Sequence, residues 1–330
     1  MFLLARHMLP VRILGTGHAL PPRAVSTAEL VRNLGSVRSP EDMERRIGIR
    51  SRRWVAEGET VTTLALSALR SALAAAALAP EDLRRIILAT STGGDQLIPS
   101  TASNLVAALG LSDTCDAFDV NNACTGFLTA LDIAARSVAT DLGPVAVIGA
   151  EVLSRYLAPP TPRSYLVLAD GAGAVILGAG SGSGGVRASH LRVRRDLSGP
   201  MRTLHPGVTG LPSAITFDAP LDELARSAVA AISDASNAAL AAAGLGWPDV
   251  TWFLSHQPNG VLFDTICEAC GVPPERTIPI AAELGSLAAA SVPISLDRLW
   301  RSGRVRPGDH LLLAAVGAGT GYGAMVIQVE

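Results

Sequence analysis

One pattern of strands and helices occurs twice in this chain of 330 residues. Long helical patterns lie between short apolar runs in both copies, and such alternation indicates sheets with helices packed on their faces. We therefore expect an α/β protein made of two duplicated halves, residues 1–180 and residues 181–330. The apolar runs, typical of buried strands, recur at a spacing of 166 residues: Ile86–Thr90 with Thr251–Leu254, and Val145–Ile148 with Leu311–Ala314.

A cysteine stands where a strand is expected to turn into a helix. Ala117–Val120 predicts a buried strand, and apolar residues at helical spacing begin after Gly126. Cys124 therefore lies at a helix N-terminus, where unpaired N–H groups and the helix dipole stabilise a thiolate. A free cysteine is also a common core residue, so this segment alone leaves nucleophile and core filler equally open.

The second half offers partners for Cys124. His256 ends an expected strand and is followed by Gln-Pro-Asn259, and Ser286 is expected in the loop equivalent to that of Cys124. The turn Gly317–Gly319 presents bare backbone N–H groups of the kind that a tetrahedral oxyanion needs. A lone strand-end histidine is more often structural, and a glycine turn is often only flexible. Equivalent loops of duplicated halves face one site, which favours a cysteine–histidine pair.

Composition excludes several kinds of chemistry. All 27 cationic side chains are Arg, so Schiff-base chemistry, pyridoxal phosphate attachment and a phosphate-binding lysine are excluded. The net charge of −2 predicts no nucleic-acid partner, and no apolar stretch is long enough for a membrane span. The first residues are too short an apolar run for a signal peptide, which fits the cytoplasm. We expect no cofactor and no metal: Cys267 and Cys270 form a lone C-x-x-C pair on an expected helix.

An arginine-rich segment follows a strong helix start. Ser39 and Pro40 have the types expected at an N-cap and first turn, and Gly48 is expected to end the helix. The basic residues either form a solvated face or bind phosphate, because the planar guanidinium suits bidentate phosphate contact. The cluster consists of Arg45, Arg46, Arg50, Arg52 and Arg53.

The sequence contains four motifs that resemble those of β-ketoacyl-acyl-carrier-protein synthase III of the thiolase superfamily, in the same order along the chain. The resemblance covers nearly the whole chain from Gly15 onward, and it implies the five-layered αβαβα thiolase fold. It also implies a homodimer that transfers acyl groups by a ping-pong reaction through a cysteine thioester, with acyl carrier protein or coenzyme A as the carrier. The motifs are Phe118-Asp-Val-Asn-Asn-Ala-Cys-Thr-Gly-Phe, Asp170-Gly-Ala-Gly-Ala, His256-Gln-Pro-Asn and Gly285-Ser-Leu-Ala-Ala-Ala-Ser-Val-Pro.

The resemblance also implies roles for single residues. Cys124 is the nucleophile, and His256 takes its proton or donates to the thioester oxygen. The backbone N–H groups of Cys124 and Ala318 form the oxyanion hole, although the family usually has Gly where Ala318 stands. Three further residues are expected to bind the substrate or the phosphate of its carrier: Arg46, Arg163 and Asn259.

Two departures from the family pattern change the expected reaction. Ser286 occupies the place of the catalytic Asn, which together with the histidine holds the enolate of a decarboxylating malonyl thioester. Loss of one oxyanion donor costs roughly 2.7–4 kcal/mol, enough to slow decarboxylation. Asp42 replaces the Trp that stacks on adenine, which argues against coenzyme A as the preferred carrier.

We therefore expect an acyltransferase of the kind found in antibiotic and polyketide biosynthesis. It would pass the acyl group from Cys124 to a hydroxyl of a small-molecule intermediate or to another carrier protein, without decarboxylation. The alternative is a decarboxylative synthase in which Ser286 and a water replace the Asn. A catalytically silent partner subunit ranks lower because Cys124 and His256 are both present, and a hydrolase lacks a carboxylate after His256 to orient it.

Overall fold

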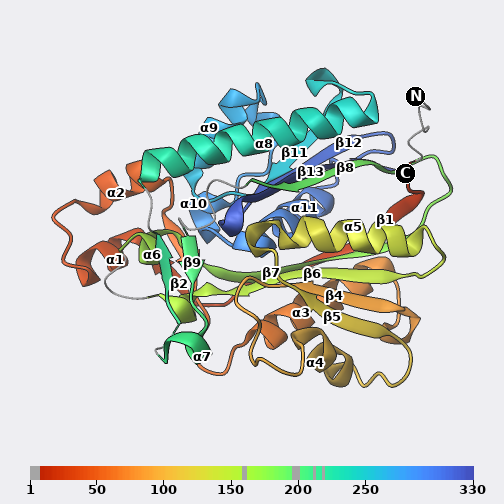
Figure 1. Cartoon of the computed structure of the whole chain (residues 1–330), viewed down its shortest axis with the longest axis horizontal. Coiled ribbons are helices and arrows are strands. Elements are labelled where there is room, and N and C mark those ends of the chain that lie inside the picture. Colours follow the sequence, from red (N-terminus) through yellow and green to blue (C-terminus); the bar gives the residue numbers. More distant parts are fainter. Residues whose placement is uncertain (1–7, 158–161, 195–200, 211–212, 218–219) are drawn as a thin grey trace.

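The computed structural model describes residues 8–157, 162–194, 201–210, 213–217 and 220–330. Two sheets, two buried helices between them and helices on both outer faces make five layers, αβαβα, as the sequence predicts (Figure 1). The buried helices are α5 (Gly126–Val138) and α11 (Ser291–Arg301). Helices α3 (Val61–Ala76) and α4 (Thr101–Ala108) cover one outer face, and α8 (Leu221–Ala243) and α9 (Gly260–Ala269) cover the other.

The first sheet has five strands in the order β1-β7-β6-β4-β5. The strands β1 and β7, and β7 and β6, run antiparallel, whereas β6, β4 and β5 run parallel. Strand β5 is the edge strand, and for that reason it is only partly buried, where the sequence predicts a buried strand. The bounds are β1 (Val11–Ala19), β4 (Arg85–Ala89), β5 (Asp116–Val120), β6 (Val145–Val152) and β7 (Asp170–Ala179).

The second sheet repeats this arrangement with one strand fewer. Its order is β8-β13-β12-β11, with antiparallel, antiparallel and parallel neighbours, so β8 corresponds to β1 and β11 to β4. The duplication is thus visible in the strand order of the two sheets, while the boundary between the two halves at residue 180 stays a prediction. The bounds are β8 (Gly185–Val193), β11 (Trp252–Ser255), β12 (His310–Val316) and β13 (Gly321–Gln328).

Among the described residues, the second half has no strand that corresponds to β5: Ile278–Ala281 forms none, and helix α10 (Ala281–Leu284) begins there. Pro279 has no N–H to give to a sheet ladder. The side chain of Gln257 satisfies the backbone instead. Its Nε2 donates to the carbonyl of Ile278 (2.8 Å), and its Oε1 accepts from the N–H groups of Ile280 (2.8 Å) and Ala281 (3.0 Å).

The two buried helices show where the halves correspond. Each follows a short 3-10 turn, η2 (Ala123–Thr125) before α5 and η7 (Ala288–Ala290) before α11. Both turns open on an alanine with positive φ, 46° at Ala123 and 42° at Ala288. The counterpart of Cys124 is therefore Ala289. Ser286, which is expected from the sequence in the loop equivalent to that of Cys124, lies three residues before this counterpart.

Smaller elements gather at one end of the molecule, on the left of Figure 1. Ser39 caps α2 by accepting from the Asp42 N–H, and Gly48 ends it with φ 64°, as predicted. None of the helices among the described residues is long and apolar enough to cross a bilayer. The elements are β2 (Ala24–Ser26), α1 (Thr27–Asn33), α2 (Pro40–Ile47), β3 (Ser51–Arg53), α6 (Pro162–Val167), β9 (Met201–Thr203), α7 (Pro206–Thr209) and β10 (Ile215–Phe217).

Close contact between β1 and α3 gives a test of the packing. A Cβ at Gly17 would lie 2.4 Å from the carbonyl oxygen of Ala68 and 2.5 Å from the N of Ala72, and backbone atoms cannot move aside. We expect Gly17→Ala to lower the free energy of unfolding by about 1–3 kcal/mol in urea denaturation. The matched control is Gly246→Ala, whose Cβ would lie 3.4 Å from Pro248. Equal midpoints for the two variants would contradict the close packing.

Candidate active site

Cys124 lies in η2, between β5 and the buried helix α5, and is only 8% exposed. Its apolar surroundings include Leu153, Leu168 and Ala288. The turn at Gly317 from the second half packs directly on it, since a Cβ at Gly317 would lie 2.9 Å from the Cys124 N. Only glycine fits at this position, and the two halves meet at the cysteine.

The electrostatic surroundings of the sulfur act in opposite directions. Burial and the carboxylate of Glu151 raise the pKa of the Cys124 thiol to about 12, while the N–H groups of Cys124 itself and of Ala318 lower it. The prediction of a stabilised thiolate is therefore wrong for the free protein. The helix N-terminus is present, but desolvation and a nearby negative charge outweigh it. The same two N–H groups stand where the sequence predicts an oxyanion hole.

His256 directly follows β11 and is 3% exposed. Its backbone N–H donates to Ala314 (2.8 Å), which fixes it to the neighbouring strand β12. Burial lowers the pKa of His256 to about 4, so the ring is neutral. Its Nδ1 is buried and has no hydrogen-bond partner in the described part of the chain.

Ser286 follows the glycine that ends α10 and is 4% exposed. Its N–H donates to the carbonyl of Val167 (2.7 Å), and its carbonyl accepts from the N–H of Ala169 (2.9 Å). The second half is thereby joined to the segment between α6 and β7. Within residues 8–157, 162–194, 201–210, 213–217 and 220–330, the Ser286 hydroxyl makes no hydrogen bond.

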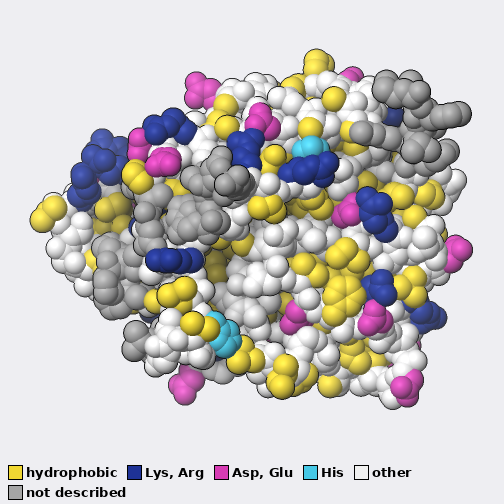
Figure 2. Space-filling view, in the orientation of Figure 1, with side chains coloured by type: hydrophobic (Ala, Val, Ile, Leu, Met, Phe, Trp, Pro, Cys, Tyr) yellow, Lys and Arg dark blue, Asp and Glu magenta, His cyan; other side chains and the backbone are white. Residues whose placement is uncertain are grey.

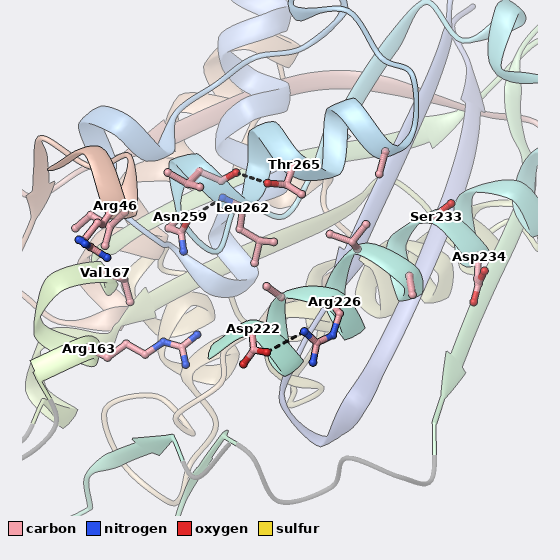
Figure 3. A pocket seen from close by; sticks show the side chains of 16 residues that line it. Arg46, Arg163, Val167, Asp222, Arg226, Ser233, Asp234, Asn259, Leu262 and Thr265 are labelled. Atoms are coloured by element: carbon pink, nitrogen blue, oxygen red, sulfur yellow. Dashed lines mark hydrogen bonds and ion pairs between the residues drawn. The ribbon is translucent and has the colours of Figure 1, made fainter. Parts of the chain in front are cut away.

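A cavity of about 750 Å³ opens between α2, α6, α8 and α9. Three residues predicted to bind substrate line it together: Arg46, Arg163 and Asn259 (Figure 3). Arg163 points from α6 toward the side where Asp222 pairs with Arg226. Asn259 also caps α9, its Oδ1 accepting from the N–H of Leu262 (2.8 Å).

A second cavity of about 120 Å³ is lined by His256 and by the turn that contains Ala318. Arg163 and Leu262 line both cavities, so the cavity of the histidine adjoins the larger one. Met201 and Phe217, from the small sheet of β9 and β10, also line this second cavity. The sequence did not predict that β9 and β10 line the cavity, because this segment contains no recognisable motif. Cys124 and Ser286 are not among the residues that line either cavity.

The arginine cluster divides into two groups. Figure 2 shows cationic side chains gathered over α2, where Asp42 pairs with Arg38, Arg45 and Arg46. Arg52, in contrast, is fully buried and structural. It donates to the carbonyls of Val25 (3.2 Å) and Leu166 (2.6 Å) and to the Thr27 hydroxyl (2.9 Å). The interpretation of all five arginines as one exposed patch is therefore wrong.

Arg163 stands in the short helix α6, with its guanidinium 4.4 Å from the ring centre of Phe217, and residues 158–161 before this helix lie outside the described residues. Burial lowers the pKa of Arg163 to about 10, which leaves it charged at neutral pH. Its Nη1 is buried with no partner in the described ranges, so a cation with unused hydrogen-bonding capacity lines both cavities.

Glu151 is the residue that the sequence reasoning missed. It lies near the end of a strand of otherwise small and apolar residues, β6, and its side chain is fully buried. Burial raises the pKa of Glu151 to about 7, against the opposing effect of hydrogen bonds from Ser91 and Ala289. A single acid within such an apolar run is itself a sequence signal, since an unpaired charge is seldom buried without a function or a partner.

The comparisons with known proteins agree with this architecture. A solved 3-oxoacyl-[acyl-carrier-protein] synthase III from Aquifex aeolicus superimposes with a TM-score of 0.89 at 31% identity, covering 96% of this chain and 99% of that one. The priming β-ketosynthase of the R1128 polyketide pathway gives 0.90 at 29% identity, with 100% and 99% coverage. The molecule is thus a thiolase-fold enzyme with two duplicated halves.

The sequence comparisons define the family. The family model "3-Oxoacyl-[acyl-carrier-protein (ACP)] synthase III" matches residues 118–194, and the model of the C-terminal part of the same family matches residues 240–329. A β-ketoacyl-[acyl-carrier-protein] synthase III of Rhizorhabdus wittichii is 40% identical over 325 residues, 96% of this chain and 98% of that protein. The chain belongs to the 3-oxoacyl-[acyl-carrier-protein] synthase III family and is an enzyme with a transferase-type activity.

The raised pKa of Cys124 is open to direct measurement. Iodoacetamide alkylates only the thiolate, whose fraction rises about tenfold for each pH unit below the pKa. We expect the rate at Cys124 to keep rising between pH 8 and 10 without a plateau, because its pKa is about 12. Peptide mapping separates Cys124 from the half-exposed Cys115, and Cys124→Ala confirms the assignment. A plateau below pH 9 would contradict this electrostatic account.

Proposed function

We propose that the protein moves an acyl group from a carrier thioester, through a thioester on Cys124, to a second acceptor without decarboxylation. The acceptor is a hydroxyl of a natural-product intermediate or another carrier protein. The observation that carries this proposal is Ser286, which stands where the family pattern has an Asn. Acyl transfer uses Cys124, His256 and the N–H groups of Cys124 and Ala318, whereas decarboxylative condensation also needs the amide donor.

The position of Ser286 supports a weakened enolate site. Its backbone is held on both sides by hydrogen bonds to Val167 and Ala169, so the hydroxyl cannot move outward to make up for its shorter reach. A hydroxyl also donates one hydrogen where an amide offers two. A lost donor at a developing oxyanion costs about 2.7–4 kcal/mol, roughly a hundredfold to a thousandfold in rate.

The first half-reaction can proceed with the groups that are present. Neutral His256 takes the thiol proton as the sulfur attacks the thioester carbonyl, and the two N–H groups stabilise the resulting oxyanion. The departing carrier thiolate takes a proton from His256. The acceptor hydroxyl then gives its proton to His256 as it attacks the acyl-Cys124, and the Cys124 thiol re-forms.

The larger cavity supports a phosphopantetheine-bearing carrier protein as donor. Arg163 has an unused buried guanidinium N–H at the entrance, and Arg46 lines the same cavity. Asp42 occupies the place of the adenine-stacking Trp and accepts from Arg46 (2.9 Å). Asp42 offers no aromatic face on which an adenine ring could stack, whereas the phosphate of a carrier protein needs no such face.

A second candidate is decarboxylative 3-oxoacyl synthesis, in which Ser286 and a water replace the Asn. The relatives favour it: the Rhizorhabdus wittichii protein is named a β-ketoacyl synthase III, and a Rhodothermus marinus protein, 38% identical over 96% of this chain and 93% of that protein, is named a 3-oxopimeloyl synthase. The two candidates share acylation of Cys124 and differ only in the fate of the acyl group after it has been loaded.

The two candidates predict different products from the same acylated enzyme. After acylation of Cys124, verified by intact-protein mass, malonyl carrier protein is offered in one reaction and hydroxylated small molecules or a second carrier protein in others. We expect transfer to an acceptor and carbon dioxide release at least a hundredfold slower than transfer. Rapid formation of a β-ketoacyl product would establish the synthase instead, and an enzyme that never acquires the acyl mass would be a silent subunit.

Restoring the amide tests the role of Ser286 itself. We expect Ser286→Asn to raise malonyl decarboxylation by about tenfold or more, because an amide donor returns to the enolate site. Ser286→Ala is the matched control and removes the hydroxyl without adding a donor. Acylation of Cys124 should remain within a factor of about three in both variants. No gain in Ser286→Asn, with decarboxylation lost in Ser286→Ala, would indicate that the serine already serves condensation.

A further inference from the structure

A buried carboxylate joins the two halves behind the nucleophile. Glu151 is the second-last residue of strand β6, next to Val152, and its side chain is fully buried. Both oxygens accept from the backbone N–H of Ser91 (3.1 Å each), and Oε1 also accepts from the Ser91 hydroxyl (2.6 Å). From the other half, Oε1 accepts the N–H of Ala289 (3.2 Å).

These bonds reach both 3-10 turns of the site. Ala289 is the counterpart of Cys124, and the turns η7 and η2 contact each other. On the other side the carbonyl of Ser91 accepts from Asn121 Nδ2 (3.4 Å), and Asn121 Oδ1 accepts from the N–H of Ala123, beside Cys124. Glu151 therefore fixes η7 directly and η2 through Ser91 and Asn121.

The carboxylate has no counter-charge. All of its partners are neutral N–H and O–H groups, and the ion pairs of the described residues do not include it. Of the other ionisable groups on neighbouring elements, His256 is neutral, and Asp119 and Asp170 are engaged by backbone N–H groups of α4 and of residues 55 and 154. None of these groups therefore supplies a cation that offsets the field of ionised Glu151 at Cys124.

We propose that Glu151 is a positioning residue of this enzyme: its carboxyl group fixes the turns of Cys124 and Ala289 against each other and, once ionised, adds to the effect of burial in keeping the resting cysteine a neutral thiol. A thiol is slow to react with oxidants and electrophiles, so the free enzyme is protected. Deprotonation is left to the moment when a donor thioester occupies the site. The role concerns the free protein and does not depend on which acceptor later takes the acyl group.

Two substitutions test the effect of the charge of Glu151 separately from the effect of the length of its side chain. Glu151→Gln keeps the length and an acceptor oxygen but removes the charge. We expect iodoacetamide alkylation of Cys124 at pH 8 to accelerate about tenfold for each unit by which its pKa falls. Glu151→Asp keeps the charge but is one methylene shorter. We expect a wild-type alkylation profile and faster backbone hydrogen exchange in residues 286–291, measured by mass spectrometry.

Asp297→Asn is the matched control. Asp297 is also fully buried and lies on α11, but it binds Thr16, His18 and Arg301 and exerts no effect on Cys124. We expect its alkylation profile to equal that of the wild type. An equal acceleration in Asp297→Asn and Glu151→Gln would overturn the proposal, since a general loosening of the fold would then explain both.

The wild-type protein gives a readout that needs no variant. Because the pKa of Glu151 is about 7, we expect its ionisation to flatten the rise of the Cys124 alkylation rate with pH near neutrality, and the slope to recover above pH 8. A uniform tenfold rise per pH unit from pH 6 to 9 would overturn the electrostatic part. Unchanged hydrogen exchange at residues 286–291 in Glu151→Asp would overturn the positioning part.

Discussion

The close contact between the turns of the two halves determines how the rest of the site is built. A Cβ at Gly317 would lie 2.9 Å from the Cys124 N, so the backbone of the second half touches Cys124, the proposed nucleophile of the first. This contact brings the Ala318 N–H to the sulfur. It exists because α5 and α11 both lie between the two sheets, each preceded by the same left-handed alanine turn. The duplicated fold therefore supplies the backbone donors, and single side chains supply the rest.

Burial then sets the state of each ionisable group. Cys124 and His256 have lost their water, and in such surroundings charged forms are costly, so both rest neutral: a thiol and an imidazole. Glu151 is buried as well, and it makes no ion pair with any of the described residues. A neutral pair becomes reactive only when a developing oxyanion gains the N–H groups of the two halves. The site is thus arranged for the transition state rather than for a permanently ionised nucleophile.

The sequence was sufficient for the layers, the duplication and the set of residues around the cavities, because apolar runs and motif order depend on local patterns. It could not reveal that the Gln257 side chain, rather than a neighbouring strand, makes the backbone hydrogen bonds of Ile278–Ala281. Those hydrogen bonds depend on where side chains lie across the core. For the same reason it assigned Arg52 to an exposed cluster. The correspondence of Cys124 with Ala289 depends on φ values that both halves adopt with different residues, so comparison of motifs alone could not find it.

Ser286 shows how such a fold changes its reaction without changing its structure. The residue is held by its own N–H and carbonyl, through Val167 and Ala169, and these bonds are the same for any side chain. The hydroxyl makes no hydrogen bond in the described part of the chain, so the fold does not require it. Substitution there costs little stability but removes or restores a donor at the point where a malonyl enolate would form. On the proposed function, the division between condensation and simple acyl transfer therefore depends on one side chain in a backbone that both reactions share.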